Sequence, residues 1–145
     1  MEAVQSEQEQ VKEKIEKIFA ENNAIMMATT GGEYSPWILG AYFATDGLDV
    51  YMLLEKSGKT MSNLEQSKKV AISISQNDAT KDFLQGYGEI EILDDDQDER
   101  VRKYITDKMP WFQTYTPVSP CVIRINKFFV TSLEEGWFPA KTLEQ

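Results

Sequence analysis

The sequence predicts a mainly β protein, an antiparallel barrel with a few helices at its edges. Apolar runs of strand length recur between short turns along most of the chain. In the stretch 69–76, apolar residues alternate with small or polar ones, as in a half-buried strand. Strands and helices do not alternate regularly, which disfavours a doubly wound parallel sheet and favours a barrel. With 145 residues the chain is expected to form a single domain.

Three helices are predicted in this domain. The first covers residues 7–21, where Ser6 and Glu9 form a capping box ahead of one apolar stripe. A short helix is expected at 57–66, and a third at 96–109 before Pro110. The N-terminal helix, at 1–21, is followed by a barrel at 22–133 and a tail at 134–145.

Six or seven strands are predicted between these helices. A turn at 31–36 and the hairpin signal Asp46-Gly47 separate the first three strands. Gly86 and Gly88 leave room for a bend or a close backbone approach. The expected strands cover residues 24–30, 37–45, 48–54, 69–76, 82–93, 121–126 and 128–132.

Composition excludes several classes of function. The net charge of −9 disfavours binding to nucleic acid or to an anionic membrane. The chain has no histidine, which removes Ser-His-Asp catalysis and histidine-ligated zinc or haem. Cys121 is the only cysteine and is expected to be a buried strand thiol, and no metal site is expected. No segment reads as a signal peptide or a membrane span, so a cytoplasmic protein is expected.

The segment from Ser57 to Leu64 is either a phosphate site or an ordinary strand-to-helix turn with a surface lysine. It follows an apolar strand and begins a helix, where free backbone N–H groups and the helix dipole attract anions. Lys59 adds a charge, and hydroxyl groups add donors. Gly58-Lys59-Thr60 has the ending of a nucleotide-triphosphate loop, but the glycine that such a loop needs five positions earlier is Leu53. ATP or GTP hydrolysis is therefore not expected.

The order of these pieces resembles the pyridoxamine-phosphate-oxidase-related, FMN-binding split-barrel family. The resemblance covers residues 22–130 and rests on the order and spacing of motifs that are weak one by one. These are Met27-Ala28-Thr29-Thr30 with Pro36, Asp46-Gly47 with Tyr51-Met52-Leu53, Ser57-x-Lys59-Thr60-x-x-Asn63-Leu64, Lys69-Val70-Ala71-Ile72 and Gln85-Gly86-Tyr87-Gly88-Glu89-Ile90.

The resemblance implies a six-stranded antiparallel split β-barrel that binds FMN at the interface of a homodimer. Lys59 would pair with the flavin phosphate, with Ser57 and Thr60 as hydroxyl donors. The isoalloxazine ring would lie against the strand 37–43 and the backbone of Leu53 and Leu54. Tyr42 would stack on the ring, and Trp111 would cover it from the partner chain.

The resemblance is not complete, and it leaves the reaction open. Pyridoxamine-phosphate oxidases hold their substrate with Arg and His near the C-terminus, and this tail has neither. That oxidation is therefore not expected, and no residue stands out as a general acid or base. We expect a small flavin-dependent oxidoreductase or electron-transfer protein, exchanging electrons with a small molecule or another protein. The alternatives are a deazaflavin-dependent reductase and a non-catalytic, ligand-binding dimer.

Overall fold

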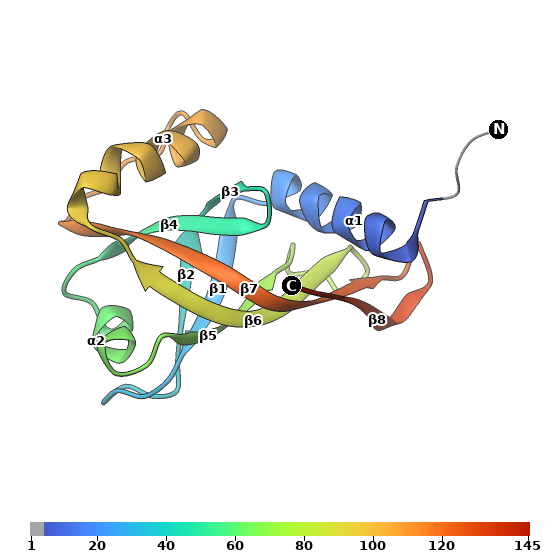
Figure 1. The fold of residues 1–145 in the computed structure, drawn as a ribbon, viewed down its shortest axis with the longest axis horizontal. Coiled ribbons are helices and arrows are strands. Elements are labelled where there is room, and N and C mark those ends of the chain that lie inside the picture. Colours follow the sequence, from blue (N-terminus) through green and yellow to red (C-terminus); the bar gives the residue numbers. More distant parts are fainter. Residues whose placement is uncertain (1–4) are drawn as a thin grey trace.

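Eight antiparallel strands and three helices make up residues 5–145, which the computed structural model describes (Figure 1). One curled sheet contains the strands in the order β2-β1-β5-β6-β7-β4-β3, and β8 pairs with β7 beside this path. This arrangement confirms the predicted mainly β barrel with peripheral helices, although it has eight strands rather than six. The strands are β1 (Ala24–Thr29), β2 (Trp37–Tyr42), β3 (Ala44–Asp46), β4 (Asp49–Glu55), β5 (Lys69–Ile74), β6 (Phe83–Ile92), β7 (Val118–Ser132) and β8 (Trp137–Glu144).

The helices lie around the sheet at separate places (Figure 1). They are α1 (Glu7–Glu21), α2 (Lys59–Gln66) and α3 (Asp98–Lys108), which a short 3-10 turn, Asp95–Gln97, precedes. The predicted cap of α1 is present, because the Ser6 side chain accepts a hydrogen bond from the Glu9 N–H. α2 begins two residues later than predicted, with Gly58 as its N-cap.

The predicted strand 37–45 is in fact two strands that pair with opposite ends of the sheet. β2 pairs with β1, whereas β3 pairs with β4, so the chain changes partner at Phe43 and draws the two ends of the sheet together. The Phe43 N–H donates to the Asn23 carbonyl, and its side chain is fully buried. The corner could not be predicted, because residues 37–45 form one continuous, mostly apolar run in the sequence.

The Lys108 ammonium fastens the same corner from α3. It donates to the backbone carbonyls of Phe19, Asn22 and Phe43, and it lies 3.8 Å from the centre of the Phe43 ring. Burial lowers the pKa of Lys108 to about 8. The three carbonyl oxygens, by contrast, favour the protonated amine. Lys108 therefore joins the end of α1, the strand corner and the end of α3.

The C-terminal part of the chain differs from the prediction in two ways. The strands expected at 121–126 and 128–132 form one continuous strand, β7, which runs on through Lys127. A register shift at Tyr87/Gly88 lets this long strand bend, and a Cβ atom at Gly88 would lie 2.0 Å from the Arg124 carbonyl oxygen. The tail, for which no strand was predicted, forms β8, whose buried Trp137 lies beneath the ammonium groups of Lys14 and Lys141.

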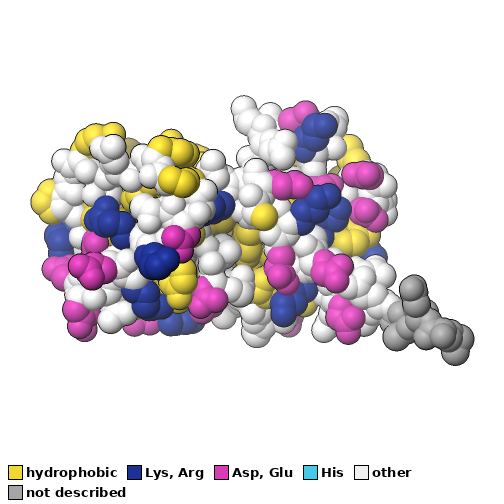
Figure 2. All heavy atoms as spheres, turned by 90° about the horizontal axis from the view of Figure 1, so that it is seen from above, with side chains coloured by type: hydrophobic (Ala, Val, Ile, Leu, Met, Phe, Trp, Pro, Cys, Tyr) yellow, Lys and Arg dark blue, Asp and Glu magenta, His cyan; other side chains and the backbone are white. Residues whose placement is uncertain are grey.

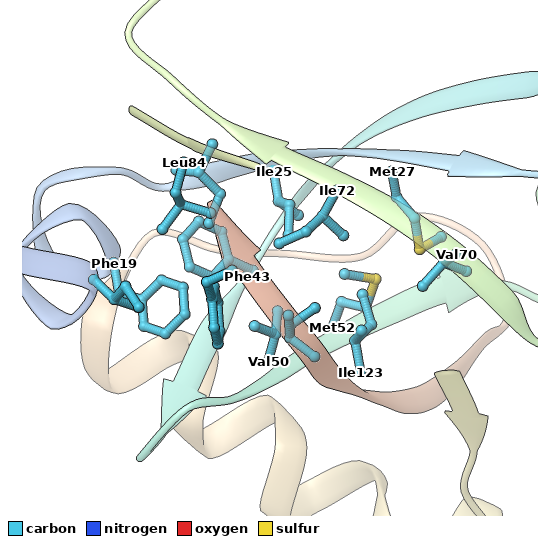
Figure 3. Close-up of a cluster of buried hydrophobic side chains, with 14 of the residues drawn as sticks. Phe19, Ile25, Met27, Phe43, Val50, Met52, Val70, Ile72, Leu84 and Ile123 are labelled. Atoms are coloured by element: carbon cyan, nitrogen blue, oxygen red, sulfur yellow. The ribbon is translucent and has the colours of Figure 1, made fainter. Parts of the chain in front are cut away.

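The core lies inside the curled sheet and beneath α1. Figure 3 shows the Phe43 side chain among residues from α1, β1, β4, β5 and β7. Phe19 of α1 meets Phe43 edge to face, with ring centres 6.0 Å apart. A smaller cluster under α3 contains Leu53 and Val122, so β4 and β7 are buried on both faces. Cys121 is fully buried as predicted, and burial raises the pKa of its thiol to about 12, which makes it inert.

Candidate functional site

A groove of about 430 Å³ lies between β2, the end of β4, the start of α2 and the segment that follows α3. Its volume is within the range of small-molecule sites in proteins. The lining is mostly apolar or uncharged, and its charged members are Glu55 and Lys59. The residues around it are Trp37, Leu39, Gly40, Ala41, Tyr42, Leu53, Leu54, Glu55, Gly58, Lys59, Thr60, Phe112, Gln113, Thr114, Tyr115, Thr116 and Val118.

The N-terminus of α2 forms one end of this groove. Gly58, its N-cap, has no side chain that could bond the free amides. The first helical bond runs from the Ser62 N–H to the Gly58 carbonyl, at 3.1 Å. The N–H groups of Lys59, Thr60 and Met61 precede that bond and have no partner inside the helix. Together with the helix dipole they give this end of the groove a positive potential.

Thr60 has a hydroxyl group that is buried but makes no hydrogen bond. The residue is 5% exposed, and its Oγ1 has no hydrogen-bond partner among residues 5–145. Asn63 Oδ1 is likewise buried without a partner, but it does not line the groove. A buried polar atom without a partner costs about 1–3 kcal/mol. Since Thr60 also lines the groove, a ligand oxygen there would give this hydroxyl the partner that the protein does not supply.

Lys59 brings the positive charge of the groove. Its ammonium lies 5.6 Å from the centre of the Tyr34 ring and 5.5 Å from that of Trp37. Within residues 5–145, none of the ion pairs includes Lys59. The neighbouring Lys56, in contrast, pairs with Asp95 at 2.8 Å. Lys59 is therefore a cation without a carboxylate partner at the end of the groove where the α2 amides are free.

The structure brings together five of the seven residues that the sequence predicted for the site. Tyr42, Leu53, Leu54, Lys59 and Thr60 all line the groove. The other two do not line it. Ser57 is exposed and precedes the helix, and Trp111 is 56% exposed and packs edge to face on Tyr42, with ring centres 5.1 Å apart.

One wall of the groove, the segment 112–116, was not predicted from the sequence. Phe112 packs on Tyr42, with ring centres 6.1 Å apart. Arg102 of α3 holds this segment, because its guanidinium forms two hydrogen bonds with Asp98 and one, of 3.0 Å, with the Thr114 hydroxyl. The sequence does show three aromatic residues between Pro110 and Pro117, but it does not show which element they face.

Comparison with family models decides the identity of the fold. The model of the pyridoxamine 5'-phosphate oxidase family matches residues 11–124, well over half of the chain. The chain belongs to this family. The resemblance seen in the sequence is thereby confirmed. No curated protein sequence matches the chain.

Solved structures agree with the fold at low sequence identity. A heme-binding protein from Mycobacterium smegmatis is 17% identical with a TM-score of 0.77, and the match covers 98% of this chain and 60% of that one. General Stress Protein 26 from Bacillus anthracis is 14% identical with a TM-score of 0.72, over 94% of this chain and 99% of that one. A NimC/NimA family protein from Clostridium acetobutylicum is 12% identical with a TM-score of 0.64, over 97% and 94%. At such identities the likeness extends to the fold alone.

The described part of the chain contains neither a metal-binding cluster nor a helix that could span a membrane. Residues 5–145 contain no group of three or more His, Cys, Asp or Glu side chains placed to hold a metal ion. None of the helices in the same range has the length and apolar character needed to cross a membrane.

The unpaired Thr60 hydroxyl leads to a prediction about the stability of the protein without ligand. Thr60→Val removes an oxygen that bonds to nothing, so the free energy of unfolding should stay the same or rise by about 1 kcal/mol. Thr29→Val is the matched control, since the Thr29 hydroxyl accepts a 3.1 Å bond from the buried Asn63 side chain. It should cost about 1–3 kcal/mol. Urea unfolding of the two variants measures both values, and a larger loss from Thr60→Val than from Thr29→Val would contradict this account.

Proposed function

We propose that this protein binds FMN in the groove and acts as a small flavin-dependent oxidoreductase or electron-transfer protein. The observation that carries the proposal is the buried, unpaired Thr60 hydroxyl beside the free amides of α2 and the unpaired Lys59. A phosphate monoester offers charge to Lys59 and acceptor oxygens to the amides and the hydroxyl. Family membership supports the proposal.

The rest of the groove fits an isoalloxazine ring. The surface between Tyr42, Leu53 and Phe112 is apolar and aromatic, as a planar ring requires. FMN itself would supply the hydride or electron transfer. The protein would bind the phosphate at α2, orient the ring against β2 and β4, and exclude water with the segment 112–116. No group in the lining is placed as an evident general acid or base, which suits simple redox transfer.

Heme is the cofactor named for the similar Mycobacterium smegmatis protein, and the groove supports it less well. This chain has no histidine, and the groove lining contains neither methionine nor cysteine. Of the usual axial ligands, only tyrosine remains there. Oxidation of pyridoxamine phosphate is not proposed either, because the tail pairs with β7 as β8 and contributes nothing to the groove lining.

A deazaflavin remains the second candidate, because its phosphate would meet the same Lys59 and α2 amides. The visible spectrum of the purified protein, with FMN or a deazaflavin added if it is colourless, separates the candidates. Tighter binding of FMN supports the proposal. Tighter binding of the deazaflavin would favour a deazaflavin-dependent reductase. A bound flavin that neither a nicotinamide cofactor nor a partner reductase reduces would favour a non-catalytic ligand-binding dimer.

We also propose a homodimer, for which the outer face of the sheet gives support. Ile38, Ala28, Ala71 and Tyr87 stand opposite one another on β2, β1, β5 and β6, so they form one row across four strands. Ile38 is 60% exposed and Tyr87 is 49% exposed. An exposed apolar row of this kind is typical of an interface. A second copy is the favoured occupant because Tyr42, on the same sheet, also lines the groove, so a partner there would cover the flavin.

Charge on the surface is consistent with a partner other than nucleic acid. In the view of Figure 2, Lys and Arg side chains are scattered among Asp and Glu side chains and form no basic field. Net charge of −9 points the same way. We propose that the redox partner is a small molecule or another protein, and that it meets the flavin at the open side of the groove.

The first prediction of this proposal concerns the affinity for flavins. Lys59→Met should weaken FMN binding about 10- to 100-fold, because a charge-assisted contact with phosphate is lost. The affinity for riboflavin, which has no phosphate, should change less than about threefold. Lys56→Met is the matched control, since Lys56 is close in the chain but pairs with Asp95 outside the groove. Titration of flavin fluorescence measures all of these affinities. Equal losses of FMN and riboflavin would remove Lys59 from the phosphate role.

The second prediction concerns the oligomeric state. Sedimentation equilibrium of the wild-type protein at micromolar concentration should give the mass of two chains. Ile38→Asp should give the mass of one, because it would bury a charge in the interface without a partner. Leu133→Asp, at an exposed position in the turn between β7 and β8, should remain a dimer. A monomeric wild-type protein, or a dimeric Ile38→Asp variant, would contradict the proposed interface.

A further inference from the structure

Two aromatic rings lie beside the exposed Lys59 side chain, close to its ammonium. Tyr34 lies in the turn between β1 and β2, and Trp37 is the first residue of β2. The rings stand 6.3 Å apart at an angle of 59°. Both centres are within 6 Å of the ammonium, the range in which a ring attracts a cation.

The turn that carries Tyr34 lies directly against α2. A Cβ atom at Gly32 would lie 2.2 Å from Asn63 Oδ1 and 2.8 Å from Asn63 Cα, so only glycine lets the turn approach this closely. Asn63 is fully buried, and its side-chain amide donates to the Thr29 hydroxyl at the end of β1. Asn63 is four residues after Lys59 and therefore lies on the same face of the helix. The contacts that hold the turn thus also hold the rings beside Lys59.

This arrangement limits the freedom of a side chain that would otherwise be mobile. A lysine on the surface loses much rotamer entropy when it is held in place by a ligand. Here the two rings attract the exposed ammonium, and they do so without a carboxylate that a phosphate would have to displace. Glu55, the acidic residue of the groove, forms no ion pair with Lys59.

We infer that Tyr34 and Trp37 are positioning residues that hold Lys59 at the N-terminus of α2, and that they make the groove selective for ligands ending in a phosphate monoester. The inference rests on the proposed function, since FMN is the ligand in question. The rings act through Lys59, so their contribution appears in the preference for FMN over riboflavin.

The test compares three variants by the ratio of the riboflavin Kd to the FMN Kd. Tyr34→Leu/Trp37→Leu should lower this ratio about 3- to 20-fold, because two cation–π contacts are lost. Tyr34→Phe/Trp37→Phe keeps both rings and should hold the ratio within about threefold of wild type. Phe138→Leu removes an exposed ring on β8 and should leave it unchanged. In a Lys59→Met background the leucine substitutions should not lower the ratio further.

The outcomes separate this inference from the proposed function. A leucine variant whose ratio stays at the wild-type value would overturn the inference. With equal weakening of FMN and riboflavin, the rings would only support the fold. With no weakening of either ligand, the rings would not act on Lys59. A wild-type protein that does not prefer FMN would defeat the proposed function. In that case NMR of the free protein decides: the Lys59 ε-methylene protons should be shifted upfield by the rings and should return to ordinary values in the leucine variant. Ordinary values in wild type would overturn the inference.

Discussion

The buried corner at Phe43 is the constraint on which the remaining structure depends. The strand that enters it pairs with β1, and the strand that leaves it pairs with β4, so this residue closes the sheet on itself. Three interactions hold the corner: the Asn23 carbonyl accepts its N–H, the Phe19 ring packs against its ring, and Lys108 donates to its carbonyl. Because protein interiors are closely packed, a corner fixed from three sides has little freedom to open.

Closure at this corner places the groove. It brings β2 close to β4, and β4 leads through a short turn into α2. The apolar wall and the helix N-terminus therefore come from one short stretch of chain on either side of the corner. α3 contributes twice, since Lys108 holds the corner at its end and Arg102 holds the segment 112–116 by its bond to Thr114. The groove is thus a consequence of how the barrel closes rather than a separate addition to it.

The elements that could be predicted from the sequence are those set by interactions between residues close together in the chain. The Ser6 cap fixed the start of α1, and alternating residues identified β5. The segment proposed to bind phosphate could be identified because a strand followed by a helix start has free amides wherever it occurs. The partner change at Phe43 could not be predicted, since an uninterrupted apolar run does not reveal which strand pairs with each half. The β8 tail was missed because Pro139 and the charged Lys141 obscure its pattern. Nor could the unpaired Thr60 hydroxyl be predicted, because burial and missing partners are properties of the folded chain.

The proposed function depends on the N-terminus of α2 holding the phosphate of a flavin. Backbone amide NMR during titration with FMN tests it most directly, because the amide of each residue reports its own contact. With FMN, the largest shifts should occur at the amides of Lys59, Thr60 and Met61. Riboflavin should leave these amides nearly unmoved and should shift those of β2 and of Leu53 and Leu54. Binding of FMN with no greater shift at Lys59, Thr60 and Met61 than riboflavin gives would contradict the claim.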